Sequence, residues 1–73
     1  MAQNIRPLLA KRLRYLRQKK NLTQESLSNR SGVSLKYVQN LEGKTPYNPT
    51  LETLQKLADG FEIPLWKLLR FEE

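Results

Sequence analysis

Two helix-start signals stand close together in the middle of this sequence, and they constrain its fold more than any other feature. Thr23 and Ser34 each have the residue type of a helix N-cap. Each is preceded by an apolar residue and followed four positions later by another, which is the spacing of a hydrophobic staple. Between them, Gly32 is able to adopt a positive φ at low cost and so end the first helix. The sequence therefore predicts two short helices about ten residues apart, joined by a tight turn.

Apolar spacing predicts a helix before this pair as well. The apolar residues of the first segment recur at helical intervals, at Ile5, Leu8, Leu9, Leu13 and Leu16. Pro7 suits a first helical turn, where its missing N–H costs nothing. We therefore expect a first helix from about Pro7 to Lys19.

Two further helices are expected after a loop of turn-forming residues at 43–49. Thr50 is a third N-cap, and helical spacing continues from there to Phe61, although Asp59-Gly60 weakens the end of this helix. Pro64 opens a short last helix. Because no alternating strand pattern is present, the predicted fold class is all-α, with five helices in one domain over residues 1–73 and a core of about 5–69. The predicted core leucines and valine are Leu13, Leu16, Leu27, Val38, Leu41, Leu54, Leu57 and Leu65.

The positive charge is concentrated at the beginning of the chain. The formal net charge is +6, and residues 1–20 contain seven Lys or Arg and no Asp or Glu. Residues 50–73 contain three basic and five acidic side chains. This asymmetry fits an oriented polyanionic partner, although a solvated cationic helix face would give the same counts.

The residue types that are missing argue against catalysis. The sequence has no His and no Cys, which removes imidazole bases, thiolate nucleophiles and zinc sites built on those ligands. A glycine-rich phosphate loop is also missing, and we expect no catalytic residue, no metal site, no cofactor and no small-molecule effector. Neither a membrane-length apolar run nor a signal peptide is present, so the expected location is the cytoplasm.

Several motifs together resemble the lambda-repressor-like, phage repressor/Cro (XRE) family of helix-turn-helix DNA-binding domains. The resemblance covers about residues 5–69, and its carriers are RLRYLR at 12–17, LTQESL at 22–27, SGVS at 31–34, YVQNLEG at 37–43 and NPTLETL at 48–54. Three departures from the family pattern stand out. Ser28 occupies a position where Ala is usual, Pro46-Tyr47 replaces a polar or basic pair, and Glu62 replaces a glycine before the last helix.

This resemblance implies a sequence-specific transcriptional regulator, a repressor or a controller-type protein, that binds double-stranded DNA. Its helix at 34–42 would enter the major groove, where base pairs present distinct donor and acceptor patterns. Lys36 would donate to guanine, Gln39 or Asn40 would pair with adenine, and the remaining candidates for base contact are Ser34 and Leu35. The alternative is that these side chains form an ordinary solvated helix face.

Contacts to phosphate are implied around the same helix. The candidates are Gln24, Arg17, Tyr37, Lys44, Thr45 and Asn48. Tyr37 has an equal alternative as a partly buried ring, and Lys44 as a plain loop lysine. The resemblance further implies an ion pair between Arg17 and Glu42 that joins the first helix to the end of the recognition helix, the alternative being an exposed Arg17.

The last helix suggests a second copy of the chain as a partner. Leu65, Leu68 and Leu69 occupy the inward side of this helix, which leaves Trp66 and Phe71 exposed. We expect a homodimer interface at Trp66, Leu69 and Phe71. A two-fold dimer would place two recognition helices about 34 Å apart, which predicts a palindromic operator. The alternative is that Trp66 folds back onto its own domain.

Two other functions use the same features. An antitoxin-like or adaptor protein-interaction module would employ this fold with a protein as its main partner, because a fold alone does not define a function. Non-specific binding to nucleic acid or to an anionic membrane would use the basic first helix, although no broad aromatic face lies opposite its basic residues. A polar face that includes Gln24, Lys36, Gln39 and Asn40 favours DNA.

Overall fold

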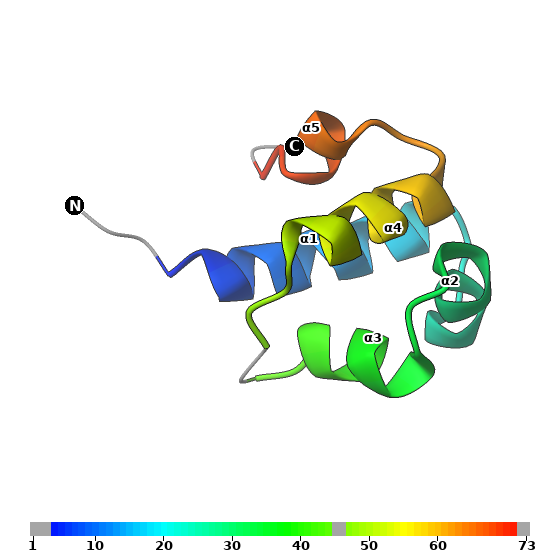
Figure 1. The fold of residues 1–73 in the computed structure, drawn as a ribbon, viewed down its shortest axis with the longest axis horizontal. Helices are drawn as coiled ribbons and strands as arrows, with labels where there is room; N and C mark the ends of the chain where they lie inside the picture. Colours follow the sequence, from blue (N-terminus) through cyan, green and yellow to red (C-terminus); the bar gives the residue numbers. More distant parts are fainter. Residues whose placement is uncertain (1–3, 45–46, 72–73) are drawn as a thin grey trace.

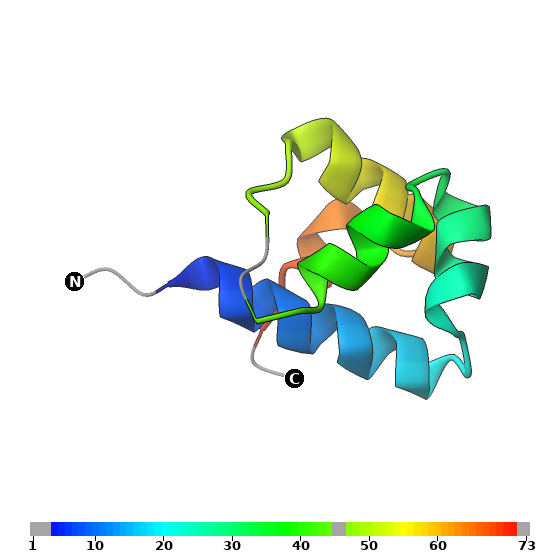
Figure 2. The ribbon, with the colours of Figure 1, turned by 90° about the horizontal axis from the view of Figure 1, so that it is seen from below.

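The computed structural model describes residues 4–44 and 47–71, and these form five helices. They are α1 (Ile5–Lys19), α2 (Gln24–Ser31), α3 (Leu35–Leu41), α4 (Leu51–Phe61) and α5 (Leu65–Leu68). Helices α3 and α5 lie on opposite sides of α1 and α4 (Figures 1 and 2). No strand occurs in the described ranges, and the predicted all-α, five-helix class is confirmed. The predicted start of the first helix was two residues late, because Asn4 caps it by accepting a hydrogen bond from the Arg6 N–H at 3.3 Å.

Each N-cap that the sequence predicted is confirmed. Thr23 Oγ1 accepts from the Ser26 N–H at 2.9 Å. Ser34 Oγ accepts from the Tyr37 N–H at 3.1 Å, and Thr50 Oγ1 accepts from the Thr53 N–H, also at 3.1 Å. Such a cap typically stabilises a helix by about 1 kcal/mol relative to Ala. Gly32, at φ +79°, ends α2 and turns the chain into α3, so local chemistry specifies the turn between the two helices.

The core lies where all five helices meet. Its largest fully buried side chains are Leu13, Leu27, Val38, Leu41, Leu57, Phe61 and Leu68. Leu54 and Leu65, predicted as core, are half-buried and pack against this cluster. Ile5 was expected on the inward stripe of α1 but is 57% exposed, because the first turn of α1 extends past its neighbours (Figure 1).

A buried arginine fastens α5 to α1. Arg12 is 4% exposed and donates from Nη2 to the Lys67 carbonyl at 2.7 Å and from Nε to the Leu68 carbonyl at 3.2 Å. These carbonyls belong to the end of a four-residue helix that has few hydrogen bonds of its own. One of the basic residues of the first segment therefore stabilises the fold and does not belong to a cationic surface.

The departures from the family pattern at positions 28 and 62 are both accommodated. The Ser28 hydroxyl donates to the Val33 carbonyl at 2.6 Å, so it is not an unsatisfied group in the helix packing. Glu62 ends α4 with φ +61°, a left-handed conformation that usually favours glycine. Its side chain pairs with Arg30 at 3.3 Å on the surface.

Gly60 has a different role from the weak helix end that the sequence suggested. It lies inside α4 and is buried where α4 crosses the last turn of α2. A Cβ atom added there would be 2.9 Å from Ser31 Cβ and 3.2 Å from the Ser31 Cα and N atoms. The close approach of α2 and α4 thus depends on the missing side chain at this position.

None of the helices in ranges 4–44 and 47–71 is long and apolar enough to cross a membrane. Within the same ranges, no three His, Cys, Asp or Glu side chains gather closely enough to hold a metal ion.

We predict that Gly60→Ala destabilises the protein by about 1–3 kcal/mol, because the new methyl group would have to displace the backbone of Ser31. The sign of this change in the free energy of unfolding is informative, since Ala ordinarily stabilises a helix relative to Gly by about 1 kcal/mol. Urea unfolding would measure the change. The matched control is Lys56→Ala, an exposed position of α4, which should change stability by less than about 0.5 kcal/mol. A Gly60→Ala protein as stable as the wild type would show that α2 and α4 do not need this close approach.

Candidate functional site

Helix α3 presents a short polar face on one outer side of the molecule. Val38 and Leu41 are fully buried, whereas Lys36 and Gln39 are exposed on the opposite side of the helix. Seen from below, α3 lies in front of the rest of the fold (Figure 2). The structure therefore brings Lys36 and Gln39 to an open surface together with the exposed cap residue Ser34, while Leu35 next to it is half-buried.

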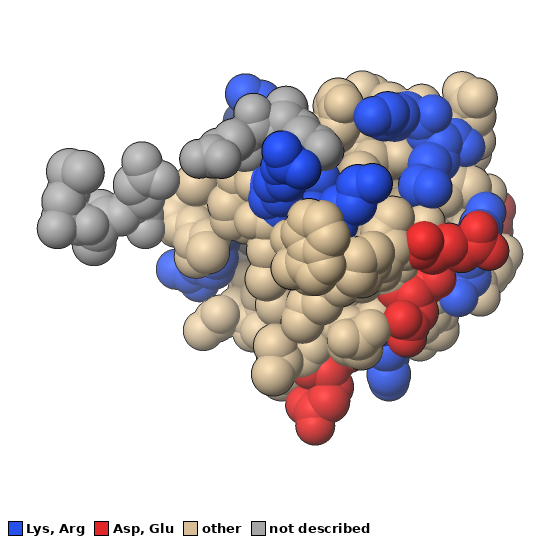
Figure 3. Space-filling view, turned by 90° about the horizontal axis from the view of Figure 1, so that it is seen from above, with Lys and Arg blue, Asp and Glu red and all other residues tan. Residues whose placement is uncertain are grey.

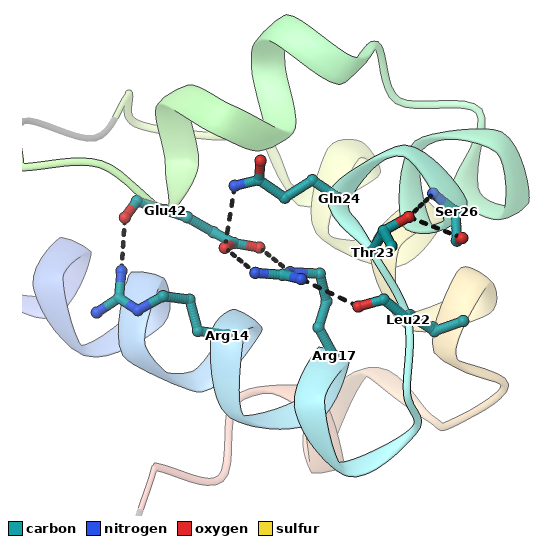
Figure 4. Close-up of polar contacts among 7 residues, drawn as sticks. All are labelled: Arg14, Arg17, Leu22, Thr23, Gln24, Ser26 and Glu42. Atoms are coloured by element: carbon teal, nitrogen blue, oxygen red, sulfur yellow. Dashed lines mark hydrogen bonds and ion pairs between the residues drawn. The ribbon is translucent and has the colours of Figure 1, made fainter.

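The C-terminal end of α3 is held by a buried carboxylate. Glu42 caps the helix, and its side chain is 3% exposed. Its Oε2 accepts from Arg17 Nε at 2.7 Å, and its Oε1 accepts from Arg17 Nη2 at 2.8 Å and from Gln24 Nε2 at 3.2 Å (Figure 4). The two hydrogen bonds from Arg17 have the two-pronged geometry that matches a guanidinium to a carboxylate. Arg17 and Glu42 thus form an ion pair between α1 and the end of α3, with Gln24 at the start of α2 as a third member.

Two further hydrogen bonds extend this network. Arg14 Nη1 donates to the backbone carbonyl of Glu42 at 2.5 Å, and Arg17 Nη1 donates to the Leu22 carbonyl at 3.0 Å (Figure 4). Helix α1 therefore donates hydrogen bonds to both the backbone and the side chain of Glu42, at the end of α3. Arg14 was not predicted as a site residue, although its spacing of three residues from Arg17 places both on one face of α1.

The ion pair also changes the acidity of Arg17. The hydrogen bond to the Glu42 carboxylate raises the pKa of the Arg17 guanidinium above its ordinary value; burial opposes this shift, and the charge of Glu42 adds to it. A raised pKa in the folded state means that protonation of Arg17 favours the folded protein at a pH below the ordinary value. This contribution is lost only as the pH rises through the higher, folded-state pKa, so it is constant over the physiological range.

The other flank of α3 is occupied by the segment that leads to α4. The Tyr47 N–H donates to Asn40 Oδ1 at 2.7 Å, and the rings of Tyr37 and Tyr47 lie with their centroids 5.2 Å apart. Asn40 and Tyr37 are both half-buried as a result. Of the other predicted phosphate contacts, Lys44 and Asn48 are exposed, and Thr45 lies outside the described residues.

An apolar face runs over the ends of α1, α4 and α5. We group Ile5, Leu51, Leu54, Trp66 and Leu69 under this name, because Leu51 and Trp66 each precede a member of the group, Leu54 or Leu69, by one helical turn. Leu51 is 68% and Trp66 is 65% exposed. Ile5, Leu54 and Leu69 line a hollow of about 190 Å³ together with Phe71. Figure 3 shows the side that carries α5, where a broad uncharged area lies in the middle of the view, with Lys and Arg above it and Asp and Glu along its right and lower edges.

Of the three residues predicted for this surface, Trp66 alone is largely exposed. Leu69 and Phe71 are half-buried against the core. Ile5 and Leu51 were missed because each stands in the first turn of its helix, at a position whose spacing suggests the inward side. Only the packing of neighbouring helices leaves those turns open.

The geometry defines a class of protein. Helix α3, which is capped and presents an exposed polar face, follows α2 after a tight turn. Buried polar contacts hold both helices against α1. This is a helix-turn-helix domain.

The helix-turn-helix family model matches residues 13–65, and the chain belongs to this family. The match agrees with the lambda-repressor-like resemblance that the sequence motifs carried, which is confirmed.

Two relatives and one solved structure show what the chain is similar to. It is 42% identical over 62 residues to the HTH-type transcriptional regulator DdrOP3 of Deinococcus deserti, covering 84% of this chain and 46% of that protein. It is 38% identical over 60 residues to the uncharacterized HTH-type transcriptional regulator y4dJ of Sinorhizobium fredii, covering 82% and 77% of the two chains. The chain therefore spans about half the length of DdrOP3 and most of y4dJ.

The solved structure is the restriction-modification controller protein C.AhdI of Aeromonas hydrophila. It matches with a TM-score of 0.78 and 35% identity over 85% of this chain and 92% of that one.

We predict that Arg17→Met destabilises the protein by about 3–5 kcal/mol, because it leaves the Glu42 carboxylate buried without its cation. The double variant Arg17→Met/Glu42→Leu should recover most of this loss, since neither buried charge remains. Chemical unfolding of both single variants and the double variant would measure the coupling.

The surface pair between Arg30 and Glu62 provides a matched control, with side chains that are 42% and 75% exposed. Arg30→Met should change stability by less than about 1 kcal/mol. Equal effects of Arg17→Met and Arg30→Met would show that the buried pair contributes no more to stability than a surface pair.

Proposed function

We propose that this protein is a sequence-specific transcriptional regulator that binds double-stranded DNA by placing α3 in the major groove. The observation that carries this proposal is the exposed face of α3, where Lys36 and Gln39 are open to solvent. The end of this helix is held against α1 by the hydrogen bonds between Glu42 and Arg17. An α-helix with its side chains is about 10–12 Å across and fits a groove about 12 Å wide. The names of its relatives, two transcriptional regulators and a controller protein, support the same class.

In this proposal the residues divide by chemistry. Lys36 donates to guanine acceptors, and Gln39 pairs through its amide with adenine. Ser34 and Leu35, at the start of α3, lie near base edges, where Leu35 offers an apolar contact to a thymine methyl group. Phosphate contacts, which fix the register without reading sequence, come from the surroundings of α3, namely Gln24, Arg17, Tyr37, Lys44 and Asn48.

The proposal sets further expectations for the whole chain. Residues 1–73 act as one DNA-binding domain, as a repressor or a controller of transcription. A regulator of this kind works beside the chromosome, which in a bacterium lies in the cytoplasm. Binding and release of DNA account for the activity, and no catalytic step is assigned to any residue.

We predict that selection from random duplexes enriches one sequence, and that Gln39→Ala lowers the discrimination at one base position by about tenfold or more. Lys36→Ala should relax a different position. The control is Lys19→Ala. In the wild-type protein the Lys19 ammonium lies over the Tyr15 ring, on the flank of α1 that faces α5, so this variant should select the same DNA sequence as the wild type. If the wild-type protein enriches no sequence, the antitoxin-like or adaptor function on the same fold becomes the better proposal.

We further propose that two copies associate through the apolar face Ile5, Leu51, Leu54, Trp66 and Leu69. Leu51 and Trp66 are exposed, and each stands one helical turn before a residue that lines the hollow, Leu54 or Leu69. Exposed apolar side chains that gather on one face are typical of a surface that another protein covers. When two copies are related by a two-fold axis, each one covers the apolar face of the other with its own. Such a dimer binds two half-sites about one DNA turn, or 34 Å, apart, which corresponds to a palindromic operator.

We predict that the wild-type protein sediments as a dimer at micromolar concentration and that Leu51→Ser and Trp66→Ser each shift it toward monomer, because each removes apolar area from the interface. Analytical ultracentrifugation would measure the shift. Lys36→Ala, at an exposed position of α3 on the side of the molecule opposite α5, is the control and should leave the dimer unchanged. A wild-type protein that is monomeric at high micromolar concentration would contradict the dimer.

A further inference from the structure

The amide of Asn40 is already engaged within the protein. Pairing with adenine requires the carbonyl oxygen of the side-chain amide to accept a hydrogen bond while its NH₂ group donates one. In this structure Asn40 Oδ1 accepts from the Tyr47 N–H at 2.7 Å, a short bond for nitrogen and oxygen. Gln39, the neighbouring amide, is exposed on the outer side of α3. One lone pair of Asn40 Oδ1 is therefore already used within the protein, whereas Gln39 is open to solvent.

The hydrogen bond from Tyr47 places a second aromatic ring beside α3. Tyr37 and Asn40 are three residues apart and share one flank of the helix. The ring of Tyr47 contacts the ring of Tyr37, with centroids 5.2 Å apart and planes tilted by 57°. Its backbone is held by Asn40, and its ring is held by Tyr37. The side chain of Tyr47 is nevertheless 47% exposed, so this attachment leaves much of the ring and its surroundings open to solvent.

The position of Tyr47 on the flank of α3 determines which part of a bound DNA duplex it faces. A helix that fills the major groove has its outer side toward the bases and its two flanks toward the two sugar–phosphate strands. Gln24 lies at one flank of α3, joined to Glu42, and Tyr47 lies at the other, joined to Asn40. A phenol hydroxyl is a neutral donor at physiological pH and suits a phosphate oxygen.

We infer that Asn40 is a positioning residue, and that Tyr47, held by Asn40 and Tyr37, donates its hydroxyl hydrogen to a backbone phosphate of the bound DNA. This inference rests on the proposed function and adds to it a contact that sequence motifs do not indicate. It also removes Asn40 from the base-reading set, so discrimination falls on Lys36 and Gln39. Tyr47 stands at a position where the family more often has a polar or basic residue, and in this chain it supplies phosphate contact by another chemistry.

The first test separates phosphate contact from base reading. Tyr47→Phe, which removes one hydroxyl, should weaken binding of the selected duplex about threefold to tenfold and leave its base preference unchanged. Tyr15→Phe removes a hydroxyl from an exposed ring on α1 and should have no effect on DNA binding. Equal affinities of the Tyr47→Phe and wild-type proteins would overturn the contact.

The second test asks whether Asn40 acts through Tyr47. Asn40→Ala should weaken binding to all duplexes by a similar factor, and the amide proton of Tyr47 should exchange with solvent on the order of tenfold faster in NMR spectra. In the Asn40→Ala background, Tyr47→Phe should add less than about twofold, because the hydroxyl is no longer held in place. Relaxed preference at a single base pair, with unchanged exchange at Tyr47, would show that Asn40 reads a base and would overturn the inference.

Failure of this inference is distinguishable from failure of the proposed function. Circular dichroism of each variant shows whether it is folded, and the exchange of the Tyr47 amide needs no DNA. A wild-type protein that binds no duplex would overturn both the proposed function and the phosphate contact. A wild-type protein that binds and selects a sequence, while Tyr47→Phe binds equally well, would overturn the contact alone.

Discussion

The position of α3 depends on the buried carboxylate of Glu42. Helix α3 has only seven residues, too few to be stable or to hold a direction without tertiary support. Its N-terminus is fixed by the Ser34 cap and the turn at Gly32, whereas its C-terminus is fixed by Arg14, Arg17 and Gln24 acting on one residue. Since a buried charge without a partner costs several kcal/mol, the network enforces one arrangement of α1, α2 and α3. The exposed face of α3 is preorganised as a consequence.

The same contacts change the meaning of the net charge. The seven basic residues in 1–20 suggested attraction toward a polyanion, yet three of them donate hydrogen bonds to other segments of the fold, and one of these three is buried. Arg12 holds the end of α5, and Arg14 and Arg17 hold the end of α3. An arginine has five N–H donors in a fixed planar fork, so it satisfies several carbonyl and carboxylate oxygens at once, which a lysine does not.

Local signals and long-range contacts were predictable to different degrees. The caps at Thr23, Ser34 and Thr50 depend on residues three positions apart, and a sequence displays such spacing directly. The Arg17–Glu42 pair spans 25 residues and was reached only through resemblance to a family. The contacts of Arg12 with residues more than 50 positions away, and the bond from Tyr47 to Asn40, had no signal in residue type or spacing.

The sequence by itself determined the helices, their caps and the turn between α2 and α3, because these follow from interactions within a few residues of one another. Tertiary structure decided which polar side chains are available to a partner. It turned Arg12 inward, brought Gly60 against Ser31, joined Asn40 to Tyr47, and left Trp66 and Leu51 open at the surface. The physical reason is that burial and hydrogen bonding of a side chain depend on atoms contributed by distant segments, and those atoms acquire positions only when the helices pack.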